Sequence, residues 1–236
     1  MLNVCYSAQY VAHTHTNSME KLKAVADALG TWPNIRFHRP EVLDIEILKQ
    51  LHDPIYVDAV NTGIPEKLAT FSGFKPWNTQ LRDAVLNINA GQILAAELAW
   101  KNDIAANIAQ GFHHAMPEFG GSFCTFNGLA LVAQQFPNKK IFVLDCDQHG
   151  GDGTAEFTRH FSNLFNFSIY GLIFGCPTYP RSVTRHVHKD KGSFAQYTLA
   201  VHEAFQMAKD WGADLIVYQA GMDCHQADPF GSSWFS

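Results

Sequence analysis

The spacing of apolar residues changes part-way along the chain. Up to about residue 100 the apolar positions recur at helical intervals. Residues 18–29 place five apolar side chains on one helical face, and Gly30 follows as a stop signal. Short helices are expected over residues 46–51 and 54–60, and a long amphipathic helix over residues 79–101. The pattern therefore predicts a mostly helical first part.

From residue 103 onward, short apolar runs alternate with amphipathic segments. Strands are predicted over residues 103–109, 140–145, 167–174 and 214–219, and helices over residues 127–135, 154–164 and 194–211. Strands that are apolar throughout and separated by helices indicate a parallel sheet that is covered on both faces. We therefore predict an α/β fold, a three-layer α/β/α arrangement with a mainly parallel sheet. Residues 1–236 are expected to form a single domain.

Composition narrows the class of protein. The net charge is −5 and no run of lysine or arginine occurs, which argues against nucleic acid as the main partner. No apolar run approaches the ~20 residues that a membrane span needs, and the start of the chain does not resemble a signal peptide. The five cysteines are scattered and never in CxxC spacing, so we expect reduced thiols and a cytoplasmic location.

Polar clusters follow three of the predicted strands. The first strand leads to the tandem pair His113 and His114, the second to the segment LDCDQHGGDGTAEF over residues 144–157, and the last to AGMDCHQADPFG over residues 220–231. In parallel sheets, ligands bind beyond the carboxyl ends of the strands. These clusters are therefore expected to belong to one site.

Asp145, Asp147 and His149 occupy every second position where the second strand ends. If the strand persists that far, these side chains point to the same side. Two of them, joined by Asp223 from a neighbouring strand end, would hold Zn²⁺ with a position open for water, and Fe²⁺ is the alternative ion. Glycines at 150, 151 and 153 permit a tight turn beside the ion.

The tandem histidines suit proton transfer at such a centre. His113 and His114 could act on water whose pKa the ion lowers, with Asp145 and Asp152 as partners that set the tautomer. Each motif alone also fits a helix cap, a turn or a buried polar pair. Their occurrence together, at successive strand ends, favours a catalytic site.

Three segments carry a resemblance to a known family. GFHHA…GGSFCTFNGLALVA, LDCDQHGGDGTAEF and AGMDCHQADPFG resemble signature segments of the histone deacetylase superfamily, which includes acetylpolyamine amidohydrolases and bacterial acetoin-utilisation deacetylases. HTHTNSMEKL and LHDPIYVDAV are similar, more loosely, to its N-terminal regions. The resemblance implies an arginase/deacetylase-type fold and a zinc-dependent hydrolase that removes acetyl groups from acetyl-lysine or acetylated small amines.

The resemblance also implies a role for each matched residue. Asp147, His149 and Asp223 would bind the metal. His113 would be the general base, backed by Asp145, and His114 the general acid, backed by Asp152. Gly121 and Phe123 would line the channel for the acylated arm, with Cys124 close by. A structural K⁺ near Asp145 is a further family expectation.

Some family features have no counterpart in this sequence. The glycine-rich loop that ends in an oxyanion-stabilising tyrosine is missing, so we expect a C-terminally incomplete domain that lacks the last strands and helices. No aspartate occurs over residues 61–80, where the family carries one that clamps the substrate. An exposed sheet edge would favour self-association unless Phe230, Trp234 and Phe235 cover it.

Two alternatives stay open at this point. A catalytically silent metal-binding homologue would result if the tyrosine loop is indispensable. A ureohydrolase with two manganese ions is disfavoured because the motif is DxDxH rather than DxHxD. The acylated substrate, whether protein acetyl-lysine, polyamine or another amine, is left undetermined.

Overall fold

The computed structural model describes residues 1–171, 176–187 and 193–228, and the chain divides into two compact units. The first unit is Met1–Gln135 and the second is Phe136–Ser236. Every paired strand in the described residues is parallel, which confirms the predicted α/β class. The expected single sheet is instead two sheets in the described residues, one in each unit. That the whole chain forms a single domain stays a prediction.

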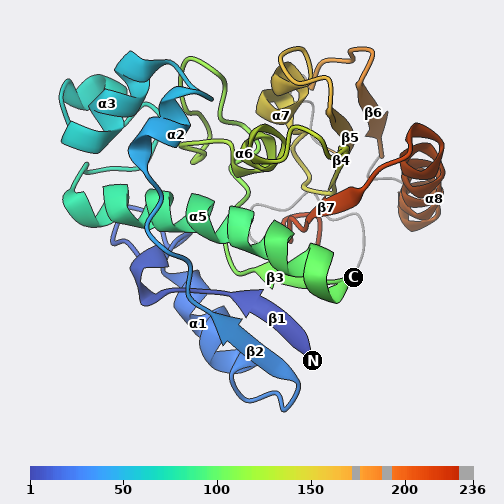
Figure 1. Ribbon diagram of the computed structural model, residues 1–236, viewed down its shortest axis with the longest axis horizontal. Coiled ribbons are helices and arrows are strands. Elements are labelled where there is room, and N and C mark those ends of the chain that lie inside the picture. The colour runs from blue at the N-terminus through green and yellow to red at the C-terminus, as the bar shows by residue number, and fades with distance from the viewer. Residues whose placement is uncertain (172–175, 188–192, 229–236) are drawn as a thin grey trace. The chain divides into compact units, whose positions relative to one another are not determined.

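The sheet of the first unit has the order β2-β1-β3 (Figure 1). Its strands are β1 (Leu2–Cys5), β2 (Ile35–His38) and β3 (Ala105–Asn107). Val4 of β1 lies opposite Phe37 of β2 and Ala106 of β3. The prediction of a mostly helical first part was wrong about β1 and β2, because strands of four residues are too short to show a period. The strand predicted over residues 103–109 is confirmed but is only three residues long.

Helices make up most of the rest of the first unit. They are the short 3-10 helix η1 (Ala8–Tyr10), α1 (Lys21–Leu29), α2 (Ile45–Lys49), α3 (Pro54–Thr62), α4 (Glu66–Ala69), α5 (Thr79–Asn102) and α6 (Gly128–Gln135). Side chains at the helix starts accept from backbone N–H groups that have no partner within the helix. Asp53 caps α3 in this way, with Pro54 in the first turn, and Asn78 caps α5 by accepting from the Leu81 N–H at 2.8 Å. The long α5 packs against β1, β3 and α6.

The second unit contains a four-stranded sheet of order β6-β5-β4-β7. The strands are β4 (Ile141–Asp145), β5 (Leu164–Tyr170), β6 (Ser182–His186) and β7 (Leu215–Gln219). Two helices accompany them, α7 (Asp152–Phe157) and α8 (Ser193–Trp211), and α8 packs against β5 (Figure 1). All five residues of β4 are buried, as the apolar run predicted.

Small and aromatic side chains meet in the core of the second unit. The rings of Phe142 and Phe165 stack with centroids 5.1 Å apart. Ala200, Ala204 and Ala208 recur at every fourth position of α8 and are buried in the same cluster. Their lack of bulk lets the helix approach the sheet closely, while each buried phenylalanine contributes about 2–3 kcal/mol of hydrophobic stabilisation.

Two boundaries in this unit differ from those predicted. The helix predicted over residues 154–164 ends at Phe157, and β5 begins at Leu164 rather than at residue 167. Phe157, Phe161 and Leu164 keep a helical spacing, but Asn163 turns the chain by donating to the carbonyl groups of Phe136 and Lys139 at 3.2 and 3.0 Å. The predicted end of that strand, over residues 172–174, lies outside the described residues, as do Phe230, Trp234 and Phe235. The polar strand β6 was not predicted.

No helix among the described residues is both long and apolar enough to cross a bilayer. All five cysteines are buried as free thiols.

Candidate metal centre and histidine loop

The candidate ligands follow two strands that lie side by side. β4 and β7 pair in parallel, with Asp145 opposite Gln219 at their carboxyl ends. The loops that follow these strands therefore leave the same edge of the sheet. This adjacency confirms the expectation that Asp223 comes from a neighbouring strand end.

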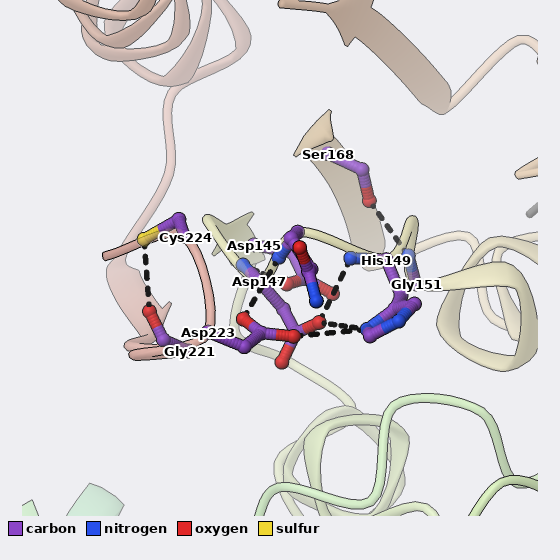
Figure 2. A network of polar contacts seen from close by, with 9 residues as sticks. Asp145, Asp147, His149, Gly151, Ser168, Gly221, Asp223 and Cys224 are labelled. Atoms are coloured by element: carbon purple, nitrogen blue, oxygen red, sulfur yellow. Dashed lines mark hydrogen bonds and ion pairs between the residues drawn. The ribbon is translucent and has the colours of Figure 1, made fainter. Parts of the chain in front are cut away.

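The strand does not extend to His149, because β4 ends at Asp145. Carboxylates hold the following loop instead of a sheet ladder. The Asp145 carboxylate accepts from the Asp147 N–H at 3.1 Å, and the Asp147 carboxylate accepts from the His149 N–H at 2.9 Å. Asp223 joins the network by accepting from the Gln148 N–H at 3.1 Å (Figure 2). The two bonds within the loop, each between a side chain and the backbone two residues on, form turns that bring the ligands together.

Asp147, His149 and Asp223 converge on one point. The Nδ1 atom of His149 lies 2.9 Å from Asp147 Oδ1 and 2.9 Å from Asp223 Oδ2. One donor atom from each residue lies within 4.8 Å of the other two (Figure 2). Two carboxylates and one imidazole at this separation are a donor set that suits a divalent transition ion.

The two carboxylates also control the protonation of His149. Burial acts to lower the pKa of its imidazole, but hydrogen bonds to Asp147 and Asp223 outweigh burial and raise that pKa to about 9. A metal ion held by these three residues would take the place of the imidazole proton. The same arrangement that attracts a proton would therefore attract a cation.

Glycines occur around this loop because there is no room for a Cβ atom, and not because the backbone is left-handed. Gly151 has a φ of −73°, and its N–H donates to Ser168 Oγ at 3.1 Å. A Cβ on Gly221 would lie 2.5 Å from the Asp147 Cα, which is closer than two carbon atoms can approach. Within the expected tight turn at residues 150–153, a Cβ on Gly151 would lie 2.3 Å from Asp145 Oδ2, so close packing against that carboxylate explains the glycine at this position.

His113 and His114 belong to the first unit, in the loop between β3 and α6. Both side chains are buried, and their ring centroids are 4.0 Å apart. Asn127 holds this loop at its end, because its side-chain amide donates to the Ala115 carbonyl at 3.2 Å. Its side-chain oxygen also accepts from the Ala130 N–H at 3.0 Å, which caps α6.

His52, in the segment between α2 and α3, anchors the same loop. Its Nδ1–H donates to the Met116 carbonyl at 2.8 Å, and its Nε2 accepts from the Asn127 N–H at 3.1 Å. Burial lowers the pKa of His52 to about 4, more than hydrogen bonds to backbone carbonyls raise it, so the ring is neutral at neutral pH. Because Nε2 must accept, only the neutral tautomer fits both partners.

The residues predicted to line a channel form a tight turn in the first unit. Gly121 and Cys124 exchange two backbone hydrogen bonds of 2.9 and 2.7 Å, and Ser122 and Phe123 between them have φ values of 46° and 61°. Cys124 is buried, whereas the Phe123 side chain is 41% exposed at the tip of the turn.

Gly120, just before this turn, is confined by its neighbours. A Cβ there would lie 2.4 Å from the Tyr56 hydroxyl and 2.5 Å from the Cys124 carbonyl oxygen, whereas a Cβ on Gly121 would have no neighbour nearer than 3.9 Å. The same Tyr56 hydroxyl donates to the Thr125 carbonyl at 2.9 Å.

Asp145 and Asp152 occupy different environments in the second unit. Asp145 is fully buried at the end of β4. Asp152 is the first residue of α7, and its carboxylate accepts from the Gly153 N–H at 2.8 Å. Their assignment as partners of the tandem histidines stays a prediction.

A scan against protein-family models matches the histone deacetylase domain over residues 15–236. The chain belongs to the histone deacetylase family. Among relatives, an uncharacterized protein of Picosynechococcus is 28% identical over 97% of this chain and 80% of its own length. Histone deacetylase 2 of Arabidopsis thaliana is 30% identical over 60% of this chain and 38% of its own length. Acetylpolyamine amidohydrolase 2 of Pseudomonas aeruginosa is 24% identical over 50% of this chain and 39% of its own length.

The fold of the family is also seen in a solved structure. The crystal structure of the HDA15 HD domain matches with a TM-score of 0.77 at 18% identity, covering 98% of this chain and 76% of that one. This match confirms the predicted fold class.

Residues that hold the loops of the histone deacetylase domain in place were harder to identify from the sequence than the candidate metal ligands. His52 and Asn127 received no role from the sequence, although His52 is the second residue of the family-like segment LHDPIYVDAV. A buried asparagine just before an apolar helix is a capping signal, and Asn127 fits it. The role of Ser168, which holds Gly151 beside the ligand loop, has no signal in the sequence.

Proposed function

We propose that this chain is a metal-dependent amide hydrolase that removes acetyl groups from acetyl-lysine or from acetylated small amines. Membership of the histone deacetylase family supports a deacetylase or amidohydrolase activity. The observation that carries the metal dependence is the convergence of Asp147, His149 and Asp223. Zn²⁺ is the proposed ion, with Fe²⁺ as the alternative, and a structural K⁺ is proposed near Asp145. Five buried thiols without disulfides support a reducing, cytoplasmic location.

A divalent ion at this triad would supply a Lewis acid that polarises the amide carbonyl and lowers the pKa of water towards ~7. The residues of the chain would then move the protons. His113 takes a proton from the attacking water, and His114 gives one to the nitrogen of the leaving amine. Asp145 and Asp152 keep these imidazoles in the required tautomers.

The relatives point to acylated amines as the substrate class. One is named an acetylpolyamine amidohydrolase, and others are named histone deacetylases. The first name refers to acetylated polyamines, and the second refers to the removal of acetyl groups from histones. Gly121, Phe123 and Cys124 are proposed to border the channel that admits this chain, which agrees with the exposed position of the Phe123 ring.

Metal analysis and a hydrolysis assay test the proposal together. The protein should bind one divalent ion and hydrolyse an acetyl-lysine peptide. His149→Ala should lose the ion, whereas His114→Ala should keep the ion and lose turnover. His202→Ala is the matched control, because this histidine is exposed on α8 and lies outside the proposed machinery.

The outcomes separate the alternatives. Absence of a bound ion in the intact protein would overturn the proposal. An ion bound without any hydrolysis would select the silent homologue. Two ions about 3.5–4 Å apart would favour the ureohydrolase.

A further inference from the structure

A groove that carries charged side chains lies near Phe123 in the first unit. It has a volume of about 590 Å³ and is lined by His15, Glu66, Lys67, Thr70, Lys75 and Pro76. These residues come from the N-terminal loop, from α4 and from the loop before α5. The groove is therefore built from the N-terminal loop and from residues 66–76, which are distant from that loop in sequence.

Contacts within the unit connect the groove to Phe123. The ring of His15 lies 5.9 Å from the Phe123 ring, and the His15 N–H donates to the Lys75 carbonyl at 2.9 Å. The Phe123 N–H donates to the Ser72 carbonyl at 2.7 Å, in the same loop that carries Lys75. A molecule whose arm passes the Phe123 ring would thus have its other end next to the groove.

The groove has an excess of positive charge. Lys67 and Lys75 are exposed, and neither has an ion-pair partner within the part of the chain that the structure describes. Glu66 is the one carboxylate in the lining, so the two lysine ammonium groups outnumber the carboxylate by one positive charge. Residues 61–80, which supply most of the lining, contain no aspartate.

We infer that this groove binds a carboxylate of the substrate, so that the chain acts on acylated amines that carry a carboxylate beyond the acylated arm. The excess of positive charge attracts an anionic group such as a carboxylate. It disfavours polycationic substrates such as acetylated polyamines, because their ammonium groups would meet Lys67 and Lys75. The inference deepens the proposed function and rests on it, because it takes Phe123 as the border of the channel.

Two ligands that differ at one group, which is charged in one and neutral in the other, test the inference. Nε-acetyl-lysine with its α-amine capped as a carbamate is compared as the free acid and as the methylamide. The free acid should have a kcat/KM about three- to tenfold higher at low salt, as expected for two exposed ammonium groups. The difference should lie in KM, because a contact with the carboxylate is made equally in the ground state and in the transition state, and it should shrink as salt is raised.

Variants of the groove identify the charges responsible. The double variant K67Q/K75Q should bring the ratio of the two kcat/KM values to about one, and Glu66→Gln should increase the ratio. Lys101→Gln is the matched control, because Lys101 is an exposed lysine of the same unit at the end of α5. It should leave the ratio as it is in the parent protein.

Equal kcat/KM values for the two ligands in the parent protein would overturn the inference, and so would a preference for the free acid that persists in K67Q/K75Q. In either case, hydrolysis of the methylamide would still support the proposed function. If neither ligand is hydrolysed, the proposed function fails on its own. Calorimetric titration of the same two ligands then decides the inference separately, since equal affinities or no binding of the free acid would overturn it.

Discussion

Low pH should decrease the free energy of unfolding of this protein by protonating His52. The variant His52→Gln should lack this dependence on pH. The neutral ring links the Met116 carbonyl to the Asn127 N–H, and a proton on Nε2 would break the second of these bonds. Gln can donate and accept at the same time, so the variant His52→Gln keeps partners of both kinds without a titrating group.

The magnitude follows from the change in pKa on folding. Burial lowers the pKa of His52 from 6.5 to about 4. Between these values the unfolded chain binds a proton that the folded chain does not, so the free energy of unfolding falls as the pH drops from 6.5 to 4. The difference of 2.5 pKa units corresponds to ~3 kcal/mol, a large share of the 5–15 kcal/mol typical of a domain. Above pH 6.5 this contribution is complete and no longer changes.

Urea unfolding at a series of pH values, followed by circular dichroism and tryptophan fluorescence, measures the effect. We expect His52→Gln to be less stable than the parent at pH 7 by about 1–3 kcal/mol, because its hydrogen bonds are less well placed in the site. The gap should close or reverse towards pH 4. His202→Gln, an exposed histidine on α8, is the control and should follow the parent. Parallel curves for the parent and His52→Gln would refute the reasoning.

Three further predictions concern the metal centre and the channel turn. Asp223→Asn should lower the affinity for Zn²⁺, measured by chelator competition. Loss of a residue that only hydrogen-bonds to a metal ligand costs about 10- to 100-fold, so loss of a ligand should cost at least as much. Unchanged affinity would contradict the role of Asp223 as a ligand. Gly221→Ala should also lower that affinity, because the new Cβ would displace Asp147, and an affinity equal to the parent's would show that the loop has room. Gly120→Ala should cost about 1–3 kcal/mol of unfolding free energy in urea, whereas Gly121→Ala should cost less than about 0.5 kcal/mol, and equal costs would argue against the packing described.

Much of the fold was readable from local patterns. The buried run of β4 and the capped helices α3 and α5 were predicted within two residues, because burial on both faces and helix caps leave strong signals in a few adjacent residues. The short strands β1, β2 and β6 were not predicted, since four or five residues carry too little pattern and are stabilised by their neighbours in the sheet.

The three candidate metal ligands converge as the sequence led us to expect, but for a partly different reason, and their role as ligands stays a prediction. Alternation along an extended strand was expected to align Asp147 and His149, whereas the strand ends at Asp145. Carboxylates that accept from backbone N–H groups two residues further on shape the loop, and Asp223 adds a bond from the neighbouring loop. The residue types indicated which atoms could bind a metal ion, and hydrogen bonds within and between the loops set the positions of these atoms.

The sequence by itself determined the parallel α/β class, the family and the identity of the candidate ligands, because these depend on residue type and on short-range spacing. Only the tertiary structure decided which strands pair, why His52 stays neutral, and that Lys67 and Lys75 line one groove with His15. Each of these depends on atoms brought together from distant parts of the chain. Their interaction energies depend on burial and on nearby charges, which a short stretch of sequence does not specify.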